Sequence, residues 1–121
     1  MFGICLLTVI PMRKNPSHKS EMINQILFGE SFKILEQKKK WVYIKLSHDN
    51  YTGWICNKQF EKKSKKKIES YTLNQNNYNV KIKGSKQRVV IGSFLPKDEL
   101  FKKKLQIEFN LNNYKSTDSG L

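Results

Sequence analysis

The chain has 121 residues, enough for one ordinary domain or two very small ones and too few for a large multidomain enzyme. Its hydrophobic fraction of 38% and aromatic fraction of 12% allow a modest core, which excludes general disorder. Lysine and arginine number 23 against 10 acidic residues, a net charge of +13. Such a chain is attracted to polyanions whether or not that is its function.

The excess of lysine has two explanations. Arg13 and Arg88 are the only arginines, alanine is absent, and asparagine and isoleucine occur 11 times each. Lysine, asparagine and isoleucine have AT-rich codons, so a strongly AT-biased genome would produce this composition without selection. The sequence leaves open whether the charge is compositional drift on a solvated surface or selection for an anionic partner.

The N-terminal run FGICLLTVI is apolar but too short to span a membrane. No basic residue precedes it and no small-residue cleavage site follows it, as a secretory signal would require. It therefore predicts a buried strand within Gly3–Met12. Without an export signal in the sequence, we expect a cytoplasmic location, with the cell envelope as the alternative.

The first 60 residues predict an all-β unit, because short apolar runs alternate with turn residues. Strands so closely spaced leave no room for crossover helices and must be antiparallel. A closed, SH3-like barrel would cover the apolar face of such a small sheet, with Ile10, Ile34, Val42, Ile44 and Ile55 in its core. The five expected strands are Gly3–Met12, Met22–Leu27, Ser31–Glu36, Trp41–Leu46 and Thr52–Cys56.

The second half of the chain has a weaker pattern. Residues 61–70 are rich in lysine and predict a linker or an exposed edge, with a basic targeting or nucleic-acid-binding tract as the alternative. Residues 71–121 predict an incomplete second SH3-like β unit that ends in a polar tail from Lys115. Its expected strands are Tyr78–Lys83, Arg88–Leu95 with a glycine bend, and Leu105–Leu111.

Two cysteines and two histidines give no metal-binding or disulfide pattern, so we expect no cofactor. Cys5 and Cys56 lie in the first and last expected strands, which are neighbours in SH3-like barrels. We therefore expect two reduced thiols packed together at the barrel seam.

Several segments resemble a known family. They are VIPMRKNPS after the first apolar run, ILFGE with its turn glycine, WVYIKL, and YTGWI followed by NKQ. In this order they resemble a bacterial SH3 (SH3b) domain, and more narrowly the N-terminal SH3b domain of NlpC-type cell-wall cysteine peptidases of the dipeptidyl-peptidase VI-like group. RVVIGSFLP resembles part of the second SH3b domain of the same proteins.

The resemblance implies a modular enzyme in which SH3b domains precede a papain-like domain with a DCSG-like motif. Such enzymes cleave the γ-D-glutamyl to diamino-acid bond of peptidoglycan stem peptides. This chain contains no Asp-Cys-Ser-Gly, so we expect a truncated, non-catalytic SH3b module that binds stem peptide or docks on the catalytic domain. The alternatives are a basic SH3-like barrel that binds nucleic acid without sequence specificity, and a truncated relic.

A peptide-binding groove needs aromatic walls and a few fixed polar groups. Strand alternation places Trp41 and Tyr43 opposite the core-facing residues, while Trp54 is either a ligand platform or part of the core. The resemblance implies that the first SH3b domain helps to hold the free amino end of the stem peptide. Glu21 and Tyr51 suit that task, and His18 and Asp49 could add polar contacts. His18 and His48 read as ordinary loop histidines.

Overall fold

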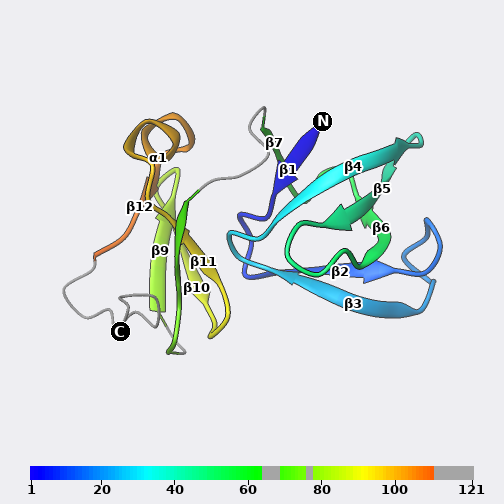
Figure 1. The fold of residues 1–121 in the computed structure, drawn as a ribbon, viewed down its shortest axis with the longest axis horizontal. Coiled ribbons are helices and arrows are strands. Elements are labelled where there is room, and N and C mark those ends of the chain that lie inside the picture. The colour runs from blue at the N-terminus through cyan, green and yellow to red at the C-terminus, as the bar shows by residue number, and fades with distance from the viewer. Residues whose placement is uncertain (64–68, 76–77, 111–121) are drawn as a thin grey trace.

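The structure is a computed structural model, and it describes residues 1–63, 69–75 and 78–110. Two β units follow each other along the chain (Figure 1). The described part is mostly strand with one short helix, which confirms the all-β class. The first unit contains β1 (Phe2–Ile4), β2 (Val9–Arg13), β3 (Met22–Leu27), β4 (Ser31–Gln37), β5 (Trp41–Leu46), β6 (Thr52–Cys56) and β7 (Glu61–Lys63).

These seven strands form one antiparallel sheet in the order β3-β2-β6-β5-β4-β1-β7. The sheet curls around a single core, but no pairing joins β3 to β7 among the described residues. The expected closed barrel is therefore wrong in this respect, and the sheet stays open between its two edge strands. The reason is that the N-terminal run supplies two separate strands, β1 and β2. Strand β1 does not lie beside β2 but pairs with β4 and β7.

The expected single strand within Gly3–Met12 is interrupted between β1 and β2. The Cys5 N–H donates to the carbonyl of Glu30 at 3.0 Å, and the Cys5 carbonyl accepts from the Gly29 N–H at 2.7 Å. These two bonds tie the chain to the turn between β3 and β4 instead of to a neighbouring strand. An apolar run cannot reveal such a break, because strand and buried loop have the same hydrophobicity.

The core of the first unit contains all five residues that alternation assigned to it. Val42 and Ile44 of β5 point inward between the half-buried Trp41 and Tyr43. Each buried aliphatic side chain contributes about 1.5–3 kcal/mol of transfer free energy. The buried cluster consists of Cys5, Ile10, Met12, Ile26, Phe32, Ile34, Val42, Ile44, Leu46 and Ile55.

The two cysteines do not lie on neighbouring strands. Cys5 follows β1, whose neighbours are β4 and β7, whereas Cys56 ends β6, whose neighbours are β2 and β5. Cys56 pairs instead with Trp41 across β5 and β6. Both thiols are free, and only Cys5 is fully buried. The predicted packed seam is thus wrong, because β7, and not β6, continues the sheet beyond β1.

The second unit contains two small antiparallel sheets and one helix. β8 (Ser70–Thr72) pairs with β11 (Phe94–Pro96), and β9 (Tyr78–Ile82) lies between β10 (Ser85–Val89) and β12 (Ile107–Glu108). The predicted glycine bend is present at Gly92, with φ of +93°, but the strands on either side of it belong to different sheets. At the expected linker, residues 61–63 form edge strand β7 and Ser70 begins β8, while residues 64–68 lie outside the described residues.

The strand expected over Leu105–Leu111 is wrong in its first part. Asp98 is the N-cap of helix α1 (Glu99–Leu105). Its carboxylate accepts from the N–H groups of Leu100 and Phe101 at 2.9 and 3.1 Å. This N-cap stabilises the helix against the alternating pattern that follows it. β12 is consequently only two residues long, and Leu111 and the polar tail lie outside the described residues.

The two units share a junction built around the turn between β3 and β4. Phe28, at this turn, is fully buried in the core of the second unit, together with Ile4 and Leu6 of the first. The Phe28 carbonyl accepts from the Phe94 N–H at 2.8 Å. Three residues of the first unit therefore complete the core of the second unit, whereas the core of the first unit consists of its own residues.

Candidate functional site

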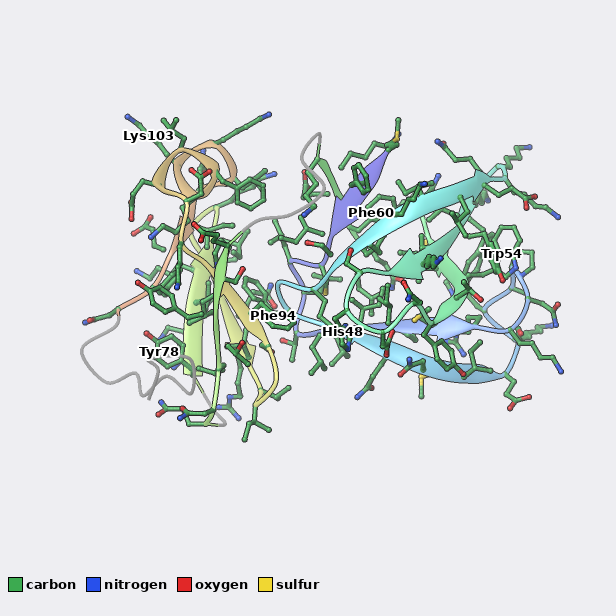
Figure 2. All side chains as sticks on the ribbon, in the orientation of Figure 1. His48, Trp54, Phe60, Tyr78, Phe94 and Lys103 are labelled. Carbon is green, nitrogen blue, oxygen red and sulfur yellow. The ribbon has the colours of Figure 1, made fainter. Side chains whose placement is uncertain are left out.

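Three aromatic residues lie on the outside of the β5–β6 hairpin. Trp41 and Tyr43 alternate with the buried residues of β5, and Trp54 lies between the buried Gly53 and Ile55 of β6. Trp41, Tyr43 and Trp54 are half-buried, so each ring keeps part of its surface in solvent. We call these three residues the outer aromatic face. Figure 2 shows Trp54 at the end of the first unit that is remote from the second.

The rings of this face are held in place by their neighbours. Tyr43 is directly opposite Trp54 in the strand register, and their ring centroids are 5.1 Å apart at an interplanar angle of 48°. The Tyr43 hydroxyl donates to Oγ1 of Thr52 at 2.9 Å. Offset or tilted aromatic pairs are favourable arrangements, so the face is preorganised and loses little side-chain freedom when a ligand binds.

The long loop between β2 and β3 covers one end of the face. The His18 ring lies 4.7 Å from the Trp41 ring, centroid to centroid. The base of the loop is closed by the Lys14 N–H, which donates to the Glu21 carbonyl at 2.9 Å. An Arg13 guanidinium N–H also donates to the carbonyl of Ser20 at 3.2 Å. His18 is therefore part of this surface, through a ring contact with Trp41.

Cationic side chains border the outer aromatic face. Lys38 places Nζ 5.3 Å from the centroid of the Trp54 ring, within the range of a cation–π contact. Arg13 is directly opposite Trp54 in the pairing of β2 with β6. The face therefore combines apolar ring surface with positive charge.

The other predicted site residues lie apart from the three rings. Tyr51, which is 41% exposed, precedes β6, and its hydroxyl donates to the carbonyl of Ile23 at 3.2 Å. Asp49 accepts from the Tyr51 N–H at 3.0 Å, which fixes the turn between β5 and β6. Glu21 is exposed at the end of the long loop, two residues before Ile23. The fold thus brings Tyr51 to the strand that Glu21 precedes.

A buried carboxylate lies at the junction of the two units and was not predicted. Glu30 is 5% exposed; its Oε1 accepts from the Leu27 N–H at 2.7 Å, and its Oε2 lies 2.8 Å from Nδ1 of His48. Burial raises the pKa of Glu30, and the hydrogen bond from Leu27 and the nearby His48 act in the opposite direction. Figure 2 shows His48 beside Phe94 of the second unit, with ring centroids 6.4 Å apart.

This carboxylate fastens the junction and does not face the aromatic rings. His48, read from the sequence as an ordinary loop histidine, therefore has a structural partner. The sequence holds one signal that could have indicated the buried carboxylate of Glu30. This signal is an acidic residue that directly follows an apolar run and a turn glycine. The contact of Glu30 with His48 joins residues 18 positions apart, which the local sequence does not reveal.

No group of three or more histidine, cysteine, aspartate or glutamate side chains suited to a metal ion occurs in residues 1–63, 69–75 and 78–110. Over the same residues, α1 is too short to cross a bilayer, and no other helix is present.

The first unit is similar in sequence to a known family. A family model described as the bacterial dipeptidyl-peptidase SH3 domain matches residues 12–60, less than half of the chain. This segment contains the outer aromatic face and all the predicted site residues. A search of curated proteins found no significant match. The SH3b resemblance is therefore confirmed for residues 12–60, which are similar in sequence to the SH3 domain of bacterial dipeptidyl-peptidases.

Proposed function

We propose that this chain is a non-catalytic SH3b module of a peptidoglycan-peptidase family and that it binds cell-wall stem peptides at its outer aromatic face. The match of residues 12–60 to the SH3 domain of bacterial dipeptidyl-peptidases carries the proposal. The geometry supports it, because this segment also contains the half-buried, preorganised rings of Trp41, Tyr43 and Trp54.

The chemistry of the surface suits a short peptide. Stem peptides offer amide planes and small apolar side chains, which can pack on aromatic rings, and also amines and carboxylates. Cations border the rings at Lys38 and Arg13, while the carboxylate of Asp49 and the hydroxyl of Tyr51 lie at the turn end of the same hairpin. Both charges of a zwitterionic peptide therefore have complementary groups along β5 and β6.

The cysteines do not support a peptidase reaction in this chain. A papain-like site needs a thiolate beside a histidine. Burial raises the pKa of Cys5 to about 12, so its thiol is protonated at neutral pH. The His18 ring packs on Trp41 and His48 lies against Glu30, so both histidines have partners other than a thiol. The proposed role is therefore binding.

Tryptophan fluorescence tests the proposal, because the only two tryptophans of the chain both belong to the outer aromatic face. Titration with the synthetic tripeptide L-Ala-γ-D-Glu-L-Lys should change the emission saturably, and Trp54→Phe should remove most of that response. A scrambled α-linked peptide of the same composition is the control. No saturable response at millimolar peptide would reject the proposal.

The nucleic-acid alternative predicts a different result in the same assay. Single-stranded DNA should then bind more tightly than the peptide and should still bind at physiological salt. Binding limited to low salt would reflect only the net charge of +13.

A further inference from the structure

The turn between β4 and β5 carries three consecutive lysines at one end of the outer aromatic face. We propose that this turn, Lys38–Lys40, recognises a carboxylate of the bound peptide, whose chain then lies on the rings of Trp54 and Trp41. This inference rests on the proposed function, because it names the chemical group recognised at the same site.

The backbone holds the three lysines close together. The Lys38 N–H donates to the Trp41 carbonyl at 2.8 Å, and the Trp41 N–H donates to the Lys38 carbonyl at 3.3 Å, which closes a two-residue turn over Lys39 and Lys40. Asn57, just after β6, adds its backbone N–H to the carbonyl of Lys40 at 3.0 Å. The turn is therefore anchored to both strands that carry the aromatic face.

Positive charge at this turn is only partly balanced. Lys38, Lys39 and Lys40 are exposed, and the ammonium of Lys38 lies over the Trp54 ring. The acidic residue closest in the strand register is Glu36, which pairs with Tyr43. Like charges on one short turn repel each other, so an anion that binds there gains attraction from several ammonium groups at once.

The two ends of the hairpin differ in charge. The lysine turn adjoins Trp41 and Cys56, whereas Asp49 and Tyr51 lie at the opposite end of β5 and β6. The six residues of β5 span about 17 Å at 3.3 Å per residue, roughly the length of an extended peptide of four or five residues. A bound stem peptide would therefore place its carboxylate end at the lysine turn and its amino end toward Asp49.

A pair of ligands tests the carboxylate. Tryptophan fluorescence is titrated with L-Ala-γ-D-Glu-L-Lys bearing free carboxylates and with the same tripeptide carrying carboxamides in their place. We expect the carboxamide peptide to bind about 5- to 10-fold more weakly, since exposed charge pairs are individually modest. Equal binding of both peptides would overturn the inference and leave the proposed function standing.

A pair of variants tests the position. Lys38→Gln with Lys39→Gln removes two charges at the turn, and Lys103→Gln with Lys104→Gln removes two from α1, which Figure 2 shows at the far end of the molecule from Trp54. The first variant should bind the free-carboxylate peptide about 5- to 10-fold more weakly and the carboxamide peptide unchanged. The α1 variant should match the wild type within twofold.

The remaining outcomes reject the inference. Equal weakening by both variants would show that net charge alone attracts the peptide, and an unaffected Lys38→Gln, Lys39→Gln variant would place the carboxylate elsewhere. Failure of both peptides to bind the wild type would reject the proposed function and this orientation with it. Far-UV circular dichroism of each variant verifies that the fold is retained.

Discussion

At the scale of single residues, the two cysteines differ in environment more than the sequence indicated. Cys5 is fully buried, its Sγ lies 3.1 Å from the Leu7 carbonyl, and burial raises its pKa to about 12. Cys56 lies half-buried on the outer side of β6. Because a thiol reagent needs an accessible thiolate, we expect it to label one cysteine in the native protein and two after denaturation.

The variant Cys56→Ser identifies the residue that reacts. This variant should not be labelled in the native state, and it should be labelled once, at Cys5, after unfolding. Rapid native labelling of Cys56→Ser would instead show that the segment between β1 and β2 opens easily, and would contradict the burial of Cys5.

Glu30 gives stability a defined pH dependence. Its pKa is raised above the ordinary 4.5, chiefly by burial, so the folded protein binds this proton more tightly than the unfolded chain. The resulting stabilisation is fully present below pH 4.5. It is lost as the pH rises through the raised pKa of Glu30 in the folded protein. The wild-type free energy of unfolding minus that of Glu30→Gln should therefore fall with pH in this window, by at most about 1.4 kcal/mol per pH unit.

Urea denaturation of both proteins between pH 4 and pH 8 measures this difference. Because His48 and Asp49 both act on the Glu30 carboxylate, His48→Gln is made in both backgrounds to remove the imidazole from the comparison. A difference that rises with pH across the window would mean that the ion pair with His48 outweighs burial.

At the scale of elements, the turn between β3 and β4 is the most constrained connection. Gly29 has φ of +82°, and a Cβ at this position would lie 1.8 Å from the Phe94 carbonyl oxygen. Gly84 has nearly the same φ, +83°, but a Cβ there would meet no atom within 4 Å. The two glycines therefore separate backbone strain from steric exclusion.

We expect Gly84→Ala to cost about 1–2 kcal/mol, the strain of a left-handed alanine, and Gly29→Ala to cost at least about 2 kcal/mol more. Chemical denaturation measures both free energies of unfolding. Equal costs would show that the second unit moves away from the turn without penalty, so that the junction contributes little.

At the scale of the whole molecule, the two units should unfold together. Phe28, Ile4 and Leu6 complete the second core, so loss of the first unit removes part of the second. Tryptophan fluorescence reports only on the first unit, where both tryptophans lie, whereas far-UV circular dichroism reports on both. We expect the two signals to follow one denaturation curve.

Phe28→Ala should lower the free energy of unfolding by about 3–5 kcal/mol, equally in both signals, because it empties a fully buried site. Leu100→Ala, at a position 80% exposed on α1, is the control and should change stability by less than about 0.5 kcal/mol. A second transition visible only by circular dichroism would contradict a shared core.

Much of the first unit follows from local pattern. Alternation placed Val42 and Ile44 in the core and Trp41 and Tyr43 outside it, because successive side chains of a strand point to opposite faces. The same reasoning located two of the three rings of the outer aromatic face, while the position of Trp54 was left open. It could not place His18 over Trp41 or Lys38 over Trp54, since those contacts join segments that are distant in sequence or cross a turn.

The sequence by itself determined the all-β class, the strands from Met22 to Cys56, half of the first core and the similarity of residues 12–60 to an SH3 domain. Only the tertiary structure decided that the N-terminal run divides into two strands, that β7 pairs with β1 at the edge of the sheet, and that Phe28 is buried by the second unit. The physical reason is the range of the interactions. Hydrophobic alternation and turn propensity act between neighbours in the chain, whereas the choice of strand partner and the burial of Glu30 depend on residues more than 15 positions away.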